Sequence, residues 1–218
     1  MGDKLTYAQI LTFISNVSDR LIQAKDQLNR MDAECGDGDF GTSMYVAFDN
    51  VRKAMEKQQK QGDVGTLLVL AGNSILSSTG GASGALFGTF FIEAGKYAKG
   101  KTEANLTDLA TMFDLSLARI QTRGGAKVGD KTLVDSLEPA VRALQEAAAT
   151  GTDLNIALER SATAAENGSQ STKSMVAKQG KSRYLGEQTL GYVDPGAFVI
   201  ALVFRILATS TTTYGSTS

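Results

Sequence analysis

The chain has 218 residues, 42% of them hydrophobic, and its 22 Lys and Arg against 23 Asp and Glu give a formal net charge of -1. This length suffices to bury the core of one ordinary domain, so we expect residues 1–218 to form a single domain, and a near-neutral charge without a basic stripe argues against nucleic acid as a partner. One Cys and no His exclude an internal disulfide, a His-containing zinc site and a nucleophile activated by His.

Apolar residues recur at steps of three and four in the first half of the chain, the spacing of one helix face. The first stripe covers 10–28 and follows Thr6 and Gln9, which make a capping box. Two further stripes predict helices over 44–55 and 67–76. These three helices place the first half of the chain in an α-helical class.

The second half continues this pattern. A fourth helix is predicted after Gly84, ending near Gly100, and Thr107 is expected to cap a fifth. The remaining predicted helices cover 131–149, with a kink at Pro139, a stretch opened by Thr152 or Asp153, a short segment at 172–178, and a last helix with Asp194 as its cap and Pro195 in its first turn. Alternating strands are nearly absent, so we predict an all-α protein of about eight helices.

The longest strongly apolar stretch lies in the last predicted helix. It covers 197–208, contains Arg205, and is shorter than the ~20 residues that span a bilayer. No secretory signal precedes the first helix. We therefore expect a cytoplasmic protein with no membrane partner.

The 23 glycines are many for a helical chain, because an interior glycine costs a helix about 1 kcal/mol. They concentrate between the predicted helices, at 36–41, 80–84, 124–129 and 180–196. In an up-and-down bundle, alternate junctions share an end. Several glycine-rich loops are thus expected to converge on one ligand.

Four carboxylates lie within eight residues at the end of the first predicted helix: Asp32, Glu34, Asp37 and Asp39. Negative charge is unfavourable at a helix C-terminus, so a cation is expected there. Oxygen donors without His or a useful thiol favour Mg²⁺, which shares its remaining positions with water and phosphate. The alternative interpretation is a solvated acidic loop.

Two motif matches in this loop fail. Gly36 to Gly41 spells Gly-x-Gly-x-x-Gly, but a dinucleotide fingerprint follows a strand, and this loop follows a helix and carries two acids. Read as an EF-hand from Asp32, the twelfth position is Ser43 instead of the bidentate Glu. Neither a Rossmann domain nor a calcium sensor is predicted.

Three other loops are candidates for binding an anion. Residues 80–84 leave backbone amides uncovered at a helix start and include Ser83. Residues 124–129 precede Lys131, which could add charge beside a second helix start. A third loop carries Lys178, Lys181 and Arg183, which suit a phosphate or the acidic face of a partner. Close helix packing, an ordinary helix entry and solvated charges are the respective structural alternatives.

Four motifs in this order resemble the dihydroxyacetone kinase L-subunit (DhaL) family across nearly the whole chain. They are Gly36-Asp37-Gly38-Asp39-x-Gly41, Gly80-Gly81-Ala82-Ser83-Gly84-x-Leu86-Phe87-Gly88-Thr89, Gly129-Asp130-Lys131-Thr132, and Tyr184-Leu185-Gly186-Glu187 with Asp194-Pro195-Gly196-Ala197. The resemblance implies a closed barrel of eight antiparallel amphipathic helices that binds ADP or ATP at one end through two Mg²⁺ ions.

The resemblance also implies residue roles. Asp32, Asp37 and Asp39 would hold the two Mg²⁺ ions. The phosphates would be lined by Phe40, Gly41, Thr42, Ser43, Ala82 and Ser83, and the rest of the nucleotide by Gly124, Leu133, Lys181, Asp194, Pro195 and Gly196. Phe40 stands where many members of the family have a polar residue, often His, and Lys181 stands where Arg is common.

The family implies a phosphotransferase with a divided active site. A separate K subunit (DhaK) holds dihydroxyacetone, or a related tetrulose, on a histidine. The donor is either exchangeable ATP or bound ADP recharged by a phosphohistidine of a third subunit, DhaM. Two alternatives remain: a nucleotide-dependent binding partner of a transcription activator, and the ATP-binding module of a fatty-acid-kinase-like system.

Overall fold

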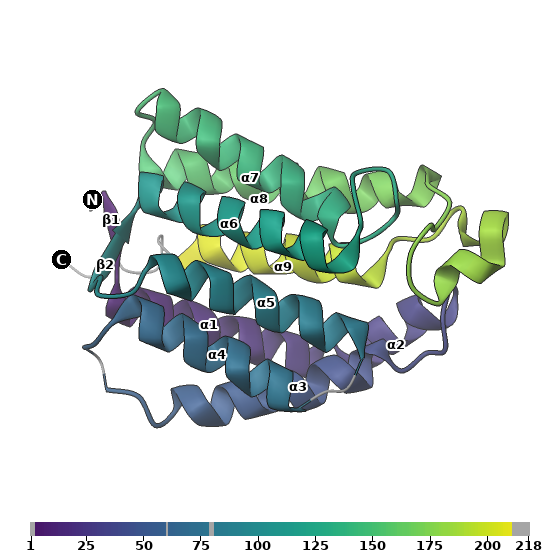
Figure 1. The fold of residues 1–218 in the computed structure, drawn as a ribbon, viewed down its shortest axis with the longest axis horizontal. Helices are drawn as coiled ribbons and strands as arrows, with labels where there is room; N and C mark the ends of the chain where they lie inside the picture. Colours follow the sequence, from purple (N-terminus) through teal and green to yellow (C-terminus); the bar gives the residue numbers. More distant parts are fainter. Residues whose placement is uncertain (1–2, 60, 79–80, 211–218) are drawn as a thin grey trace.

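The computed structural model describes residues 3–59, 61–78 and 81–210 (Figure 1). Nine α-helices lie in these residues: α1 Tyr7–Gln23, α2 Lys25–Ala33, α3 Phe40–Met55, α4 Val64–Ser78, α5 Ala82–Tyr97, α6 Leu106–Gly124, α7 Val134–Ala149, α8 Leu154–Ser171 and α9 Pro195–Ser210. The other elements are the strands β1 Lys4–Thr6 and β2 Glu103–Asn105 and the 3₁₀ segments η1 Thr172–Ser174 and η2 Ser182–Thr189. The predicted all-α class is confirmed.

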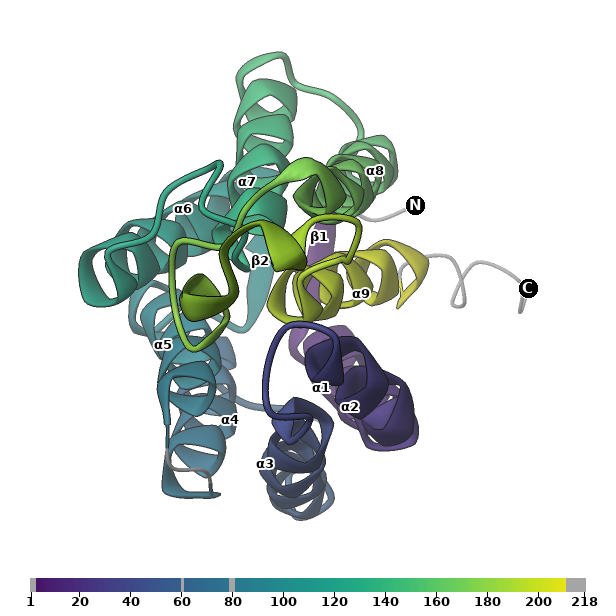
Figure 2. The ribbon, with the colours of Figure 1, turned by 90° about the vertical axis from the view of Figure 1, so that its right-hand side faces the viewer.

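Eight of the helices form a closed ring, which Figure 2 shows from one end. From α3 to α9 each helix packs on the next, and α1 closes the ring by packing on both α3 and α9. Successive helices of the ring run in opposite directions (Figure 1), so alternate loops gather at the same end. The loops before α3, α5, α7 and α9 are therefore brought to one end of the barrel.

The first predicted helix is divided. The capping box of Thr6 and Gln9 is present, but α1 ends at Gln23, and after Ala24 the chain continues as the separate short helix α2. The apolar period runs through this break, because Leu21 and Leu28 are both fully buried. The hydrophobic pattern alone therefore does not reveal the break. The separate helix α2 accounts for the difference between the eight helices of the predicted barrel and the nine α-helices in the described residues.

Other boundaries also differ from the prediction. Asn105, and not Thr107, caps α6, because its side chain accepts the N–H of Asp108 at 2.8 Å. The strands β1 and β2 were not predicted, and they form an antiparallel ladder at the end of the barrel opposite the α2–α3 loop (Figure 1). At 172–178 only the 3₁₀ turn η1 forms, where a short helix was predicted.

Aromatic side chains fill the middle of the ring. Phe90 stacks on Phe113 at 5.4 Å between ring centroids and meets Phe91 edge-on at 5.2 Å. Phe48 and Phe204 extend the row to α3 and α9. This apolar interior ties four helices together. None of the described helices is long and apolar enough to cross a membrane.

Candidate functional site

The loops at the end of the barrel that faces the viewer in Figure 2 enclose a cavity of about 450 Å³. Its walls combine acidic, basic, glycine-rich and apolar groups from five segments. The lining residues are Asp32, Gly36, Asp37, Asp39, Phe40, Ser43, Gly81–Phe87, Ile120, Arg123, Gly124, Ala126, Lys131–Val134, Gln179–Ser182 and Asp194–Gly196. This volume is in the range of small-molecule and cofactor sites.

Asp32, in the last turn of α2, organises the acidic loop. Its Oδ2 accepts backbone N–H groups of Gly38 at 2.9 Å, Asp39 at 3.1 Å and Phe40 at 3.3 Å. The carboxylate thus satisfies free amides at the start of α3. Gly36 leaves space for the other oxygen, because a Cβ there would lie 2.5 Å from Asp32 Oδ1. Burial raises the pKa of Asp32, and the amide bonds oppose this shift.

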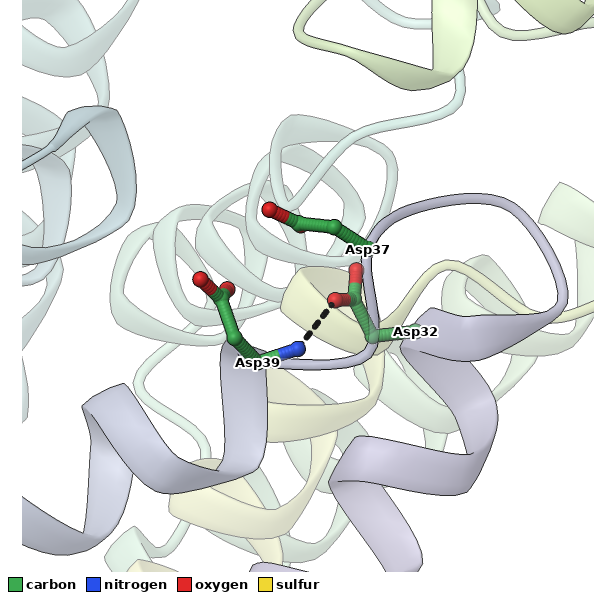
Figure 3. Close-up of side chains that lie close together, drawn as sticks. All are labelled: Asp32, Asp37 and Asp39. Atoms are coloured by element: carbon green, nitrogen blue, oxygen red, sulfur yellow. Dashed lines mark hydrogen bonds between the residues drawn. The ribbon is translucent and has the colours of Figure 1, made fainter.

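Three carboxylates converge in this loop. Asp32, Asp37 and Asp39 each offer an oxygen, and these oxygens lie within 4.8 Å of one another (Figure 3). Lys181, from the loop before η2, forms an ion pair with Asp37 and lowers the pKa of that carboxyl. Glu34, the fourth acid of the cluster in sequence, is exposed at the end of α2 and is not part of the group.

The donor set fits a hard cation. Mg²⁺ binds oxygen at about 2.0–2.1 Å, so two of its ligands lie at most about 4 Å apart, and small rotations of the exposed Asp37 and Asp39 would reach this spacing. Asp32 keeps Oδ1 free of the amide bonds. No His or thiol stands in the group, which favours Mg²⁺ over softer metals.

Two helix N-termini face the same cavity. Ala82 and Ser83 begin α5, after Gly81 at φ 110°, and Pro195 and Gly196 begin α9. The free amides of a helix start favour an anion. Gly80, the first residue of the predicted phosphate loop, lies outside the described residues.

An apolar wall completes the cavity. Leu86, Phe87, Ile120, Leu133 and Val134 line it beside the polar groups. Phe87 also packs on Phe40 at 6.4 Å between ring centroids. A ligand with a charged end and a flat apolar end matches this division.

Most of the predicted site residues reach the cavity. The lining includes the three predicted metal ligands and Phe40, Ser43, Ala82, Ser83, Gly124, Leu133, Lys181, Asp194, Pro195 and Gly196.

Gly41 and Thr42 are the exceptions, because the structure places them at the α2–α3 contact and not on the wall. A Cβ at Gly41 would lie 2.0 Å from Lys25 O, and the Thr42 N–H and hydroxyl both bond the Asn29 side chain.

Sequence reasoning missed several lining residues. Arg123, in the last turn of α6, lines the cavity and donates to Thr89 Oγ1 at 3.3 Å. Its position next to Gly124, a predicted site residue, could have indicated that Arg123 lines the cavity. Gln179 and Ser182 also line the wall. Lys131 was expected to turn its charge toward an anion, but its ammonium bonds two backbone carbonyls instead.

The ionisation of Asp194, at the start of α9, is expected to make the free energy of unfolding depend on pH. Burial raises its pKa to about 7, although Ala197 N–H donates to its Oδ2 at 2.7 Å. The folded protein then holds a proton that the unfolded chain loses near pH 4, so stability falls as pH rises from about 4 to about 7. A three-unit shift corresponds to ~4 kcal/mol, and partial exposure of the residue reduces this.

We therefore expect Asp194→Asn to flatten the pH profile. Between pH 4.5 and 8 the wild-type free energy of unfolding should fall by about 1–3 kcal/mol relative to the variant, measured by urea unfolding. Parallel profiles for the two proteins would contradict the raised pKa.

The fold and cavity define a class: a closed helical barrel with three converging aspartates and two helix N-termini around a pocket at one end. Comparison with known proteins agrees with this description. The DAK2 domain family model matches residues 34–209. The chain is 35% identical over 204 residues to the ADP-binding subunit DhaL of the PEP-dependent dihydroxyacetone kinase of Escherichia coli K12, covering 94% of this chain and 97% of that protein.

A second DhaL, from the PEP-dependent dihydroxyacetone kinase 2 of Listeria innocua, is 37% identical over 79% of this chain and 80% of that protein. The crystal structure of Citrobacter freundii dihydroxyacetone kinase with AMP-PNP and Mg²⁺ superposes with a TM-score of 0.71 at 30% identity. The match covers 92% of this chain but only 33% of that longer one. The chain belongs to the dihydroxyacetone kinase L-subunit family, whose domain is the DAK2 domain.

Proposed function

We propose that the chain is the nucleotide-binding subunit of a dihydroxyacetone-type kinase. It binds ADP or ATP with two Mg²⁺ ions and passes a phosphoryl group to dihydroxyacetone or a related small ketose held on a separate K subunit. The observation that carries this proposal is the convergence of Asp32, Asp37 and Asp39 at the cavity. Membership in a family of ADP-binding kinase subunits supports it.

The residues divide the work of holding the nucleotide. Asp32, Asp37 and Asp39 would hold the metal ions, which would supply positive charge to neutralise the phosphates. The helix starts at Ala82–Ser83 and Pro195–Gly196 would accept the phosphates, and Leu133 would pack on the base. Phosphoryl transfer needs mainly positioning and charge neutralisation, so no nucleophile is required from this chain.

Lys181 would act at the open side of the acidic group. Its ion pair with Asp37 places an ammonium beside the three carboxylates. The same ammonium would add positive charge beside the phosphates, where it would stabilise negative charge that develops during transfer. A lysine supplies this charge as a point donor, without the two-pronged geometry of the arginine that is common in the family.

We expect the acceptor to be held outside these 218 residues. A ketose attached through histidine cannot sit on this sequence, which has no His. The proposed partner is therefore a DhaK-type subunit that docks over the open end of the barrel. The names of the E. coli and Listeria relatives favour bound ADP, recharged by a DhaM-type phosphohistidine donor, over exchangeable ATP.

The test is the nucleotide content and exchange of the purified protein. We expect tightly held ADP, lost on treatment with EDTA and restored by Mg²⁺, and phosphoryl transfer to dihydroxyacetone when a K subunit and a phosphohistidine donor are supplied. Transfer with ATP and the K subunit alone would show that the donor is exchangeable ATP and not recharged ADP. ADP binding that survives EDTA, or no transfer to any ketose with either donor, would overturn the proposal.

A further inference from the structure

Lys131 is a buried lysine in the cavity wall to which the proposed mechanism gives no role. The residue is only 4% exposed. Its ammonium donates to the carbonyl oxygens of Thr172 at 2.6 Å and Tyr192 at 2.5 Å, and no ion pair with a carboxylate is recorded for it within the described ranges. An ammonium removed from water is costly, and the two carbonyls together with the nearby charges of Asp194 and Asp135 compensate this cost only in part.

The backbone at Lys131 is also unfavourable. Its φ is 59°, the single positive value at a non-glycine residue in the described part of the chain. Asp135 holds the loop in this shape, since its two oxygens accept the N–H groups of Gly129 at 2.6 Å and Thr132 at 2.7 Å. A left-handed backbone at a lysine persists only where the surroundings enforce it, and such positions cluster at functional sites.

The two carbonyls that Lys131 bonds lie near the two ends of the segment that joins α8 to α9. Thr172, at the first end, also bonds the last residue of this segment, because its Oγ1 accepts the Asp194 N–H at 2.9 Å. Tyr192 lies two residues before Asp194. Asp194 also caps α9 by accepting the Ala197 N–H. The Lys131 ammonium therefore holds in place the cap and first helical turn of α9, from Asp194 to Gly196.

We propose that Lys131 is a positioning residue for the nucleotide, acting through the Asp194–Gly196 turn. The inference rests on the proposed function, because it assigns this turn to nucleotide binding. Two of the three ammonium N–H groups donate to the carbonyls of Thr172 and Tyr192, so the ammonium can act on this turn without touching the ligand. It joins the loop after α6 to the loop before α9, and both loops line the cavity.

The test compares Lys131→Met and Lys131→Gly with wild type by calorimetric titration with Mg²⁺ and ADP. Met keeps most of the side-chain volume and loses the charge, whereas Gly also relieves the positive φ. We expect both variants to raise the Kd for ADP by roughly tenfold or more, as for other groups that support a binding shell. Lys127→Met is the matched control: it removes an exposed charge from the same loop and should leave the Kd unchanged.

Chemical rescue separates positioning from packing. In Lys131→Gly, added n-butylammonium should lower the Kd for ADP severalfold by restoring the ammonium, and 1-butanol of similar length should not. An unchanged Kd in both variants, or equal rescue by both compounds, would overturn the inference.

If neither variant folds, wild-type protein decides. The ammonium protons of Lys131, followed by ¹⁵N NMR, should exchange more slowly with water when Mg²⁺ and ADP bind, and no slowing would overturn the inference. Failure of the proposed function is distinct, because then wild-type protein binds no ADP with Mg²⁺.

Discussion

Asp37→Asn should abolish Mg²⁺-dependent ADP binding, with the Kd rising by roughly 100-fold or more, about 2.7 kcal/mol. Asn keeps the shape of the side chain but removes the negative charge that a hard cation requires. It also leaves Lys181 without its carboxylate partner, so the ammonium would repel the metal. Calorimetric titration with ADP at fixed Mg²⁺, repeated with EDTA, measures the effect.

Asp114→Asn is the control for this experiment. Asp114 is an exposed aspartate on α6 outside the cavity lining, and its substitution makes the same change in net charge. Its Kd should match wild type. Asp37 is itself exposed, so the variant should unfold at the wild-type temperature and the loss can be assigned to the site. Wild-type affinity for ADP in Asp37→Asn would contradict the assignment of Asp37 as a metal ligand.

Gly41→Ala should destabilise the fold and the site together. A Cβ at this position would lie 2.0 Å from Lys25 O and 2.8 Å from Asn29 N, and both atoms are backbone, so no side-chain rotation relieves the clash. Alanine gains about 1 kcal/mol of helix propensity, but overpacking costs about 1–3 kcal/mol or more, and a contact this short belongs at the upper end. We expect a net loss of about 2 kcal/mol, or roughly 4–8 °C in Tm.

The same clash should weaken ADP binding. Separating α2 from α3 moves Asp32 away from the amides of Gly38, Asp39 and Phe40, and the three carboxylates no longer converge. Thermal unfolding and ADP titration on one sample measure both effects. Gly151→Asn is the comparison, since Gly151 has open space around its Cβ position, and asparagine tolerates its φ of 65°. Full stability of Gly41→Ala would contradict the helix contact described here.

These two predictions separate residues that one motif places side by side. The resemblance assigned both Asp37 and Gly41 to ligand binding, and the structure gives them different tasks. Asp37 presents an oxygen to the cavity, whereas Gly41 permits the close approach of α2 and α3. Thr42 stands with Gly41, because Asn29 takes up its amide and hydroxyl. Both residues thus help to build the acidic loop, and their contact with the phosphates stays a prediction.

Much of the fold followed from local chemistry. The apolar period located the core faces of the helices. Thr6 with Gln9 marked the start of α1 correctly, and Asp153, one of the two caps predicted for α8, is the one that forms. Other boundaries depended on contacts distant in sequence. The strand β1 forms only because residues 103–105 pair with it, and α7 starts at Val134 because Asp135 holds the preceding loop in a non-helical shape.

The helical class and the acidic, glycine-rich composition of the loops followed from the residues alone, and the family resemblance selected Asp32, Asp37 and Asp39 from the four clustered acids. Three contacts could be known only from the folded chain: one Asp32 oxygen accepts the amides at the start of α3, Lys181 pairs with Asp37 across the barrel end, and the Lys131 ammonium bonds two carbonyls. The physical reason is that periodicity and capping are set by neighbours within one helical turn, whereas the partner of a charged group depends on which distant loops the closed ring brings together.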